Sequence, residues 1–525
     1  MARGEGVVSA RTFNLADLFE SVADAVGDRE ALVAAQRRLT YAALDERANR
    51  LAHHLLSLGV GPGDAVGLQM VNGTEYAEGM LACFKIRAIP VNVNYRYVAD
   101  ELRHLFEDAD IVVNITNEQF ANRVVEARTD RLEHVLVVER DYESALALSS
   151  AARDFGPRSS DDLYCAYTGG TTGLPKGVIW RHEDIFFAGM GGGDVMHSGN
   201  YISSPDELVS RIPETGMVAL ATPPLMHVSA HWLLFSLLFS GGKMVFTPQG
   251  RFDPAAIWHL VGTEAVNMLI IVGDAMARPL ADELASNTYD TSSLFVVGSG
   301  GAVLSPSTKE KLTALLPNTI VADGFGSSET GTMGTHRSTG ADRGPTRFTM
   351  NDTVAVFDDA GKRVEPGSDV IGRLARRGHI PLRYHKDEVK TAATIVTIEG
   401  ERWVLPGDFA RVRDDGTIEL LGRGSVCINT GGEKVYPEEV EAVVKGHPNV
   451  ADAVVVGVPD ERWGERVVAV IQPSDEPPTL DDIQSLCREK LAGYKVPREI
   501  KIVGEVQRSP AGKTDYRWAK QEAMS

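Results

Sequence analysis

The residue types best suited to phosphate chemistry lie in one glycine-rich segment, residues 167–178, with the sequence YTGGTTGLPKGV. Its backbone amides, threonine hydroxyls and single ammonium group can surround phosphate oxygens. A Walker loop is excluded because Lys176 is followed by glycine rather than by serine or threonine. The segment therefore predicts a phosphate loop of another class, with a plain glycine-rich turn as the alternative. The candidate contacts are Thr168, Gly169, Gly170, Thr171, Thr172 and Lys176.

A second glycine cluster, GSGG at residues 298–301, follows the apolar run 294–297. A dinucleotide fingerprint would require a third glycine at position 303, which is Val303, so hydride transfer loses its main support. The structural alternative is a tight turn at the carboxyl edge of a sheet. A doubly wound fold binds its ligands at that same edge, so the cluster is a candidate binding site.

The elements that must position these residues alternate between helix and strand. Apolar residues at spacings of three and four predict a helix over residues 44–58, ended by Gly59. Short apolar runs at 65–70, 89–93 and 110–116 predict strands. We expect this alternation to continue to about residue 420, as crossover units of a largely parallel sheet with helices on both faces.

The pattern changes beyond residue 420. Pro437 can open a helix, and it is followed by strand-like runs at 451–458 and 466–473, a helix at about 480–492 and a strand at 499–503. This order predicts a small separate α+β domain. The glycines of residues 420–426 suit a flexible joint between the two parts.

Composition sets the class of protein and its partners. The chain has 525 residues, 43% of them hydrophobic, and a formal net charge of −19. It is therefore globular, and nucleic acid and anionic membrane surfaces are poor partners for it. Its four cysteines show no CxxC spacing, so neither a disulfide framework nor a zinc knuckle is indicated and a reducing compartment is expected. We see no export signal and no spanning segment.

Six motifs together resemble the adenylate-forming (ANL) acyl-CoA synthetase superfamily in order and spacing. The match covers essentially the whole chain. The sequence is most similar to actinobacterial CoA ligases that act on steroid side chains and fatty acids, through RDFG, WRHED, GDAMARPL, GRGSVCIN and SPAGKTDYRWAK. The six motifs are residues 167–178, PPLMH (223–227), GFGSSETG (324–331), PGD (406–408), LGRGSVCINTGGEKVYPEEVE (421–441) and SPAGK (509–513).

The resemblance implies an α/β fold in two parts. Residues 1–422 would form a large ATP- and acyl-binding domain with mainly parallel sheets flanked by helices, 423–426 a hinge, and 427–525 a small mobile α+β domain. It also implies an AMP-forming acid–thiol ligase that uses ATP, Mg²⁺ and coenzyme A. A carboxylic acid, expected to be a steroid side-chain or fatty acid, would become an acyl-adenylate with release of pyrophosphate and then an acyl-CoA with release of AMP.

The resemblance assigns roles to residues of the nucleotide site. Glu329 matches the magnesium carboxylate, Asp408 the ribose-binding acid and Lys513 the catalytic lysine, whose ammonium would stabilise the adenylation transition state. Ser328 replaces a frequent threonine at the α-phosphate, and Phe325 a common tyrosine at the adenine. Further nucleotide contacts are expected from Ser299, Gly300, Gly301, Asp323, Gly324 and Arg423.

The acyl and CoA sites follow by the same resemblance. His227 would be a gate between them and a catalytic residue, although a core histidine is an equal alternative. His227, Trp232, Gly300 and Gly324 should line the acyl pocket, and Gly431 and Gly432 the pantetheine channel. The hinge position is Ser425, where relatives usually carry a charged residue.

Three other functions are weighed against this one. Adenylation of an amino acid would need an acidic group for the substrate ammonium, and residues 223–232 contain none; an aryl acid remains open. A luciferase-like oxygenase would need a lysine near Asn429. A non-catalytic nucleotide-binding protein would not need Lys513. We expect a cytoplasmic enzyme without an integral membrane segment, and a homodimer as one assembly to test.

Overall fold

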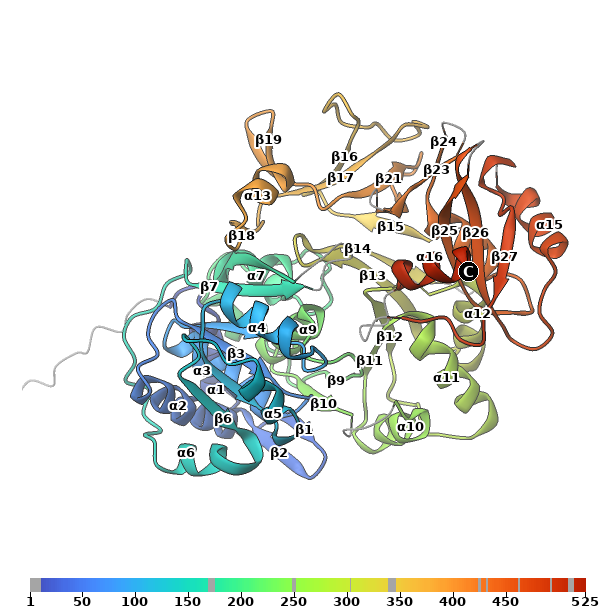
Figure 1. Cartoon of the computed structure of the whole chain (residues 1–525). Coiled ribbons are helices and arrows are strands. Elements are labelled where there is room, and N and C mark those ends of the chain that lie inside the picture. The colour runs from blue at the N-terminus through green and yellow to red at the C-terminus, as the bar shows by residue number, and fades with distance from the viewer. Residues whose placement is uncertain are drawn as a thin grey trace, which may run out of the picture. The chain divides into compact units, whose positions relative to one another are not determined.

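The computed structural model describes residues 11–168, 175–247, 252–302, 304–338, 346–423, 426–430, 433–460, 463–491, 493–508 and 514–525. At Arg423, Asn429, Glu433 and Lys434 it describes the backbone alone. The chain forms two units, each assembled from separate stretches (Figure 1). The first unit contains the chain up to Leu269 together with Ser328–Gly331 and His379–Ala393, and the second contains Ile270–Ser327, Thr332–Gly378 and the chain from Thr394.

The first unit is a mixture of helices and short strands. Its helices and helical turns are α1 (Leu15–Val26), α2 (Tyr41–Ser57), α3 (Thr74–Lys85), α4 (Ala99–Asp108), α5 (Glu118–Glu126), η1 (Val138–Tyr142), α6 (Glu143–Ala147), α7 (His182–Ala188), η2 (Gly191–Gly193), α8 (Glu207–Ser210), α9 (Val228–Phe239), α10 (Pro254–Thr263) and α13 (Glu388–Thr394). Its strands are β1 (Glu30–Ala34), β2 (Arg37–Thr40), β3 (Ala65–Gln69), β4 (Ile89–Asn92), β5 (Ile111–Thr116), β6 (His134–Val137), β7 (Leu163–Thr168), β8 (Lys176–Arg181), β9 (Val218–Ala221), β10 (Lys243–Phe246) and β18 (Arg383–Tyr384).

The predicted alternation of helix and strand is confirmed in this unit. Strands β4, β3, β5 and β6 form a parallel sheet in that order, and the predicted helix over 44–58 is α2. Gly59 follows that helix with a φ of +87°, a conformation that glycine adopts without strain. Parallel neighbours require crossover connections, which here are helices such as α3 and α4.

A small three-stranded sheet carries the strands that flank the glycine-rich segment. Its order is β18-β8-β7, and both pairings are antiparallel. Thr168 at the end of β7 lies opposite Lys176 at the start of β8. Tyr384, far along the chain, lies opposite Val178. The segment therefore joins two strands, unlike a Walker loop, which joins a strand to a helix.

The second unit is built mostly of strands. Its strands are β12 (Val296–Gly300), β13 (Ile320–Ser327), β14 (Gly331–Ser338), β15 (Arg347–Met350), β16 (Val354–Phe357), β17 (Ile371–Arg377), β19 (Ile395–Ile398), β20 (Glu401–Val404), β21 (Asp408–Val412), β22 (Ile418–Arg423), β23 (Ile428–Thr430), β24 (Glu433–Val435), β25 (Val450–Asp460), β26 (Gly464–Pro473) and β27 (Glu499–Ile502), and β11 (Met268–Ile271) spans the boundary between the units in the sequence. Its helices are α11 (Gly273–Ser286), α12 (Pro306–Leu315), α14 (Pro437–Val444), α15 (Leu480–Lys490), α16 (Tyr516–Met524) and the turn η4 (Gly493–Lys495).

The expectation that helix and strand alternate up to about residue 420 is wrong for the last part of that range. Strands β12 and β13 are parallel, but β15, β22, β21, β17, β20 and β19 pair antiparallel in that order. The cause is the short turns between them, such as residues 399–400 and 413–417, where Gly400 and Gly416 have positive φ. Such turns are too short for a crossover helix and return the chain as a neighbouring antiparallel strand.

The C-terminal residues form a five-stranded sheet with helices on two faces (Figure 1). Alternate residues of β25 point to opposite faces, as the pleat requires. Ala453 and Val455 pack with residues of α14 and α15, whereas Val454 and Val456 pack with residues of α16. The predicted elements here are confirmed, and β23, β24 and α16 are additions that the sequence pattern did not predict.

Helix α16 closes one face of this sheet, and its buried side offers a test. Ala519 is 0% exposed among valines of β25 and β26. We expect Ala519→Asp to lower the free energy of unfolding by about 3–5 kcal/mol, because it buries a charge without a partner. Gln521→Asp, on the exposed side of the same helix, is the matched control and should change it little. Equal effects of the two substitutions in urea unfolding would contradict this packing.

Candidate active site

Lys176, near the C-terminal end of the phosphate loop, is the first residue of β8. Its ammonium group forms an ion pair with the carboxylate of Asp387. The backbone amide of Lys390 also donates to that carboxylate, at 2.8 Å. The hydrogen bond from Lys176 holds the pKa of Asp387 below its usual value, so the carboxylate is charged. The remaining predicted loop contacts, Gly169, Gly170, Thr171 and Thr172, lie outside the described residues.

The turn that carries Glu329 is bound to this same sheet within the first unit. The indole nitrogen of Trp180, in β8, donates to the carbonyl oxygen of Ser328 at 3.0 Å. The hydroxyl of Tyr384, in β18, donates to Oε1 of Glu329 at 2.8 Å. Gly331 has a φ of +68°, and a Cβ there would lie 2.3 Å from the carbonyl oxygen of Ala188. The turn is therefore packed too closely for any other residue at that position.

The chemistry of Glu329 fits the predicted magnesium site. Within the part of the chain that the structure describes, Oε1 alone has a hydrogen-bond partner, so Oε2 can face a cation. No group of three or more His, Cys, Asp or Glu side chains among the described residues could hold a metal by itself. Mg²⁺ typically takes one or two carboxylates and completes its shell with phosphate oxygens and water, so a single carboxylate suffices.

The predicted acyl residues lie at the start of α9. His227 directly precedes the helix and is half-buried. Trp232 is 7% exposed, and its ring lies so close to Gly189 that a Cβ there would be 2.8 Å from it. The fully buried histidine of this helix is His231, whose ring contacts the hydroxyls of Tyr164 at 2.9 Å and Tyr76 at 3.2 Å. Burial lowers the pKa of His231 to about 3, so it is neutral at physiological pH.

In the second unit, two predicted nucleotide contacts also hold the fold together. The hydroxyl of Ser299 accepts from the amide of Gly273 at 2.9 Å and donates to the carbonyl of Ala302 at 2.8 Å. Asp323, one strand along, pairs with Lys309 at 2.6 Å, and both side chains are buried. Burial raises the pKa of Asp323 despite this partner. The Ser299 side chain thus holds the turn that follows β12, the Asp323 side chain holds Leu304 and Lys309, and the role of both residues toward nucleotide stays a prediction.

The glycines beside them leave space. Gly300 lies opposite Gly324 in the parallel pairing of β12 and β13. Among the described residues, a Cβ built on Gly300 meets no atom within 4 Å, and one on Gly324 meets a single backbone oxygen at 3.6 Å. Gly301 has a φ of +83°. Phe325 packs with Phe348, their ring centres 5.5 Å apart, at the edge of a buried apolar cluster. Gly300 and Gly324 thus leave open space at the ends of β12 and β13, whereas the Phe325 side chain points to the other face of the strand.

Asp408 lies at the start of β21, opposite Arg423 at the end of β22. It is 8% exposed. Glu438, in the first turn of α14, lies against Gly422, the residue that precedes Arg423 in β22. A Cβ on Gly422 would collide with the carboxylate of Glu438. Burial, with the charges of Glu441 and Asp408, raises the pKa of Glu438 to about 8. The acid group beside Asp408 is therefore largely protonated at neutral pH.

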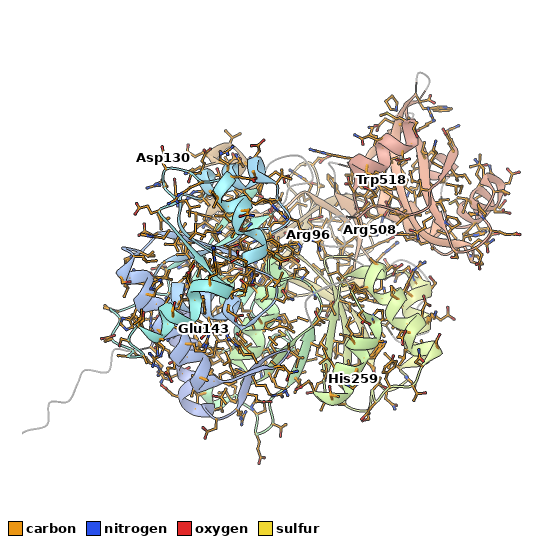
Figure 2. All side chains as sticks on the ribbon, turned by 60° about the horizontal axis from the view of Figure 1, so that its bottom comes forward. Arg96, Asp130, Glu143, His259, Arg508 and Trp518 are labelled. Carbon is orange, nitrogen blue, oxygen red and sulfur yellow. The ribbon has the colours of Figure 1, made fainter. Side chains whose placement is uncertain are left out.

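Lys513, Gly431 and Gly432 lie outside the described residues, but the ends of the lysine-bearing segment are fixed. Arg508 pairs with Thr514 as an antiparallel bridge and forms two contacts of 2.7 Å with Asp452. Asp515 caps α16 by accepting from the amides of Arg517 and Trp518. Arg508 and Trp518, labelled in Figure 2, come from the two sides of this segment.

Tyr384, Asp387, Trp180 and Glu438 are site residues that the sequence did not predict. Asp387 directly precedes a short helix, which is a local signal for a capping aspartate rather than for a partner of Lys176. Tyr384 lies in a strand of two residues, too short to stand out as a strand by its pattern. No local signal marks either residue as a partner of Lys176 or Glu329.

With this geometry established, the chain can be compared with known proteins. Residues 19–383 match the model of the AMP-binding enzyme family, and residues 439–513 match that of the AMP-binding enzyme C-terminal domain. The chain therefore belongs to the AMP-binding enzyme family. The two matched ranges contain the motifs at 167–178, 223–227, 324–331 and 509–513, whereas residues 406–408 and most of 421–441 lie between them.

Among its relatives is a 3-oxocholest-4-en-26-oate–CoA ligase of Rhodococcus rhodochrous, 48% identical over 97% of this chain and 96% of the relative. A medium/long-chain-fatty-acid–CoA/3-oxocholest-4-en-26-oate–CoA ligase of Mycolicibacterium smegmatis is 48% identical over the same shares. An anthranilate CoA ligase in complex with anthranoyl-AMP shares the fold at a TM-score of 0.85 and 23% identity, covering 98% of both chains. These comparisons confirm the predicted superfamily, the two-part α/β fold and the class of acid–thiol ligase. Among the described residues, no helix has the length and apolar character needed to cross a membrane.

The buried Glu438 predicts a pH dependence of unfolding. Because its folded pKa lies above the ordinary value of 4.5, the folded state binds more protons than the unfolded state between 4.5 and about 8. Its contribution to stability is complete below that range and declines as the pH rises through it. We expect Glu438→Gln to flatten the fall in the free energy of unfolding between about pH 5 and pH 8, measured by urea denaturation.

Glu439→Gln is the control. Glu439 lies on the same helix as Glu438, and its substitution removes an ion pair with Lys495. It should leave the slope of stability with pH unchanged. A Glu438→Gln protein with the wild-type slope would show that this carboxyl does not titrate as described.

Proposed function

We propose that this chain converts a carboxylic acid to its coenzyme A thioester in two steps. A carboxylate oxygen attacks the α-phosphorus of ATP, the bond to the β-phosphate breaks, and pyrophosphate leaves. The sulfur of CoA then attacks the acyl carbon, the bond to the AMP oxygen breaks, and the thiol proton passes to solvent. Both reactants of the first step are anions, so the site must supply cations and oriented donors.

The observation that best supports this proposal is that one small sheet links Lys176 and Glu329. Strand β8 begins with Lys176 and binds the Ser328 carbonyl, and β18 supplies the hydroxyl that contacts Glu329. A cation and a carboxylate joined in this way suit a nucleotide polyphosphate with its magnesium ion. Lys176 with Thr168, Thr171 and Thr172 would bind the β- and γ-phosphates.

The remaining roles are proposals carried by the family motifs. Glu329 would hold Mg²⁺, which neutralises phosphate charge when bound. Asp408 would accept hydrogen bonds from the ribose, Arg423 would contact ribose or phosphate, and Lys513 would bridge the carboxylate and the α-phosphate. Residues 423–426 would form the hinge between parts 1–422 and 427–525, and Gly431 and Gly432 would line the pantetheine path.

The proposed substrate is a steroid side-chain acid or a medium- to long-chain fatty acid. Two relatives at 48% identity are named for 3-oxocholest-4-en-26-oate, and one of them also for fatty acids. His227 and Trp232, at the start of the apolar helix α9, are the proposed pocket residues. The proposed location is the cytoplasm, where ATP and CoA are both supplied, and the proposed assembly is a homodimer, to be checked by sizing in solution.

A panel of acids tests the activity. We expect AMP and acyl-CoA from a cholestenoic acid, a medium-chain fatty acid or a long-chain fatty acid, with ATP, Mg²⁺ and CoA present. Benzoic acid and amino acids should give far less product. Without CoA, the preferred acid should still support release of pyrophosphate. The amount of pyrophosphate should match the amount of acyl-AMP that accumulates. Failure of every carboxylic acid to yield AMP would overturn the proposed function.

Lys513→Ala tests the proposed division of labour between the two steps. Because its ammonium would stabilise charge only in adenylation, we expect that step to slow by about 100-fold or more. Thioester formation from supplied acyl-AMP and CoA should stay close to the wild-type rate. Lys490→Ala, an exposed lysine at the end of α15, is the control. Equal losses in both steps would contradict the role given to Lys513.

A further inference from the structure

The short strand β18 fixes a stretch of chain against the strand that begins with Lys176. The amide of Leu382 donates to the carbonyl of Ile179, and the amide of His385 donates to the carbonyl of Gly177, both at 2.8 Å. These bonds lie on either side of Tyr384. They set the register of β18 on β8, in which Arg383 lies opposite Ile179 and Tyr384 lies opposite Val178.

Tyr384 is held from several directions. It is 3% exposed, and its amide donates to the hydroxyl of Thr391 at 2.9 Å. The ammonium of Lys390 lies 4.0 Å from the centre of its ring, a cation–π contact. With the ring fixed, the hydroxyl donates to Oε1 of Glu329 at 2.8 Å. This bond limits rotation of the carboxylate and leaves Oε2 for a cation.

Asp387 is fixed by the same short segment. Its carboxylate accepts from the amide of Lys390, and its carbonyl accepts from the hydroxyl of Thr391 at 2.6 Å. The ion pair with Lys176 therefore joins a flexible lysine to a rigid acceptor. The hydroxyl of Thr391 therefore links the backbone of Tyr384 to that of Asp387.

We propose that residues 384–387 form a positioning element in which Tyr384 orients Glu329 for the metal ion and Asp387 orients Lys176 for the phosphates. This inference rests on the proposed function. Partners that hold metal-binding carboxylates in place commonly change metal affinity by about tenfold or more when they are removed. A lysine with four rotatable bonds likewise loses reach and direction without its acceptor.

Tyr384→Phe tests the first half, since it keeps the ring and removes only the hydroxyl. We expect Mn²⁺ to bind the complex of protein and ATP about tenfold more weakly, measured without any acid by the free Mn²⁺ signal in electron paramagnetic resonance. The Mg²⁺ concentration for half-maximal acyl-AMP formation should rise in parallel, and saturating Mg²⁺ should restore most of the rate. In a Glu329→Gln background the same substitution should add no further loss.

Tyr289→Phe is the matched control, because the hydroxyl of Tyr289 also donates to a glutamate, Glu283, far along the chain from Glu329. It should leave Mn²⁺ binding unchanged. If Tyr384→Phe unfolds at the wild-type temperature and binds Mn²⁺ as the wild type does, the role of Tyr384 is wrong.

Asp387→Asn tests the second half. We expect the rate of acyl-AMP formation to fall by about tenfold, with thioester formation from supplied acyl-AMP unchanged. Asp110→Asn is the control, since Asp110 forms an ion pair at 2.7 Å with Lys386, which directly precedes Asp387 in the chain. Wild-type adenylation by Asp387→Asn would overturn the role of Asp387.

These outcomes separate the two proposals. If the wild type forms acyl-AMP but neither variant differs from it, the positioning element is wrong and the proposed function stands. If the wild type forms no acyl-AMP from any acid, the proposed function fails first. Mn²⁺ binding by Tyr384→Phe then still reports whether Tyr384 acts on Glu329.

Discussion

The pairing of β18 with β8 is the interaction on which the candidate site depends. The two strands are separated by about two hundred residues in the chain, and β18 consists of Arg383 and Tyr384 alone. A strand of that length has no stability of its own. It exists because the residues on either side of it, Leu382 and His385, donate backbone hydrogen bonds to the carbonyls of Ile179 and Gly177. Through this one pairing, a distant part of the chain reaches both the phosphate loop and the acidic turn.

Charge explains why such a link is useful. The chain carries a formal net charge of −19, so a polyphosphate meets an unfavourable average field. Local arrangement has to offset it. Lys176 forms an ion pair with Asp387, while Glu329 accepts from a neutral hydroxyl rather than from a cation. A carboxylate with a neutral partner keeps its full attraction for a metal ion, whereas an ammonium partner would compete with that ion.

The C-terminal sheet follows a simpler rule. Both faces of β25 and β26 are apolar, so each face must be covered by a helix. The near-continuous valine run at 453–458, which the sequence predicted only as a strand, is typical of a strand that is buried on both sides. It did not indicate which segment covers the second face, because α16 is short and follows the lysine-bearing segment.

By itself, the sequence determined the order of the motifs and the parallel sheet of the first unit, because these follow from residue types at fixed spacing, and the resemblance of those motifs to a known superfamily supplied the class of reaction. The tertiary structure alone decided which side chains meet. It placed Tyr384 on Glu329, Asp387 on Lys176 and Lys309 on Asp323, whereas the sequence offered Asp323 only as a nucleotide contact. Partners of this kind depend on pairings between distant strands, and neither local propensity nor spacing records which distant strand will supply the acceptor.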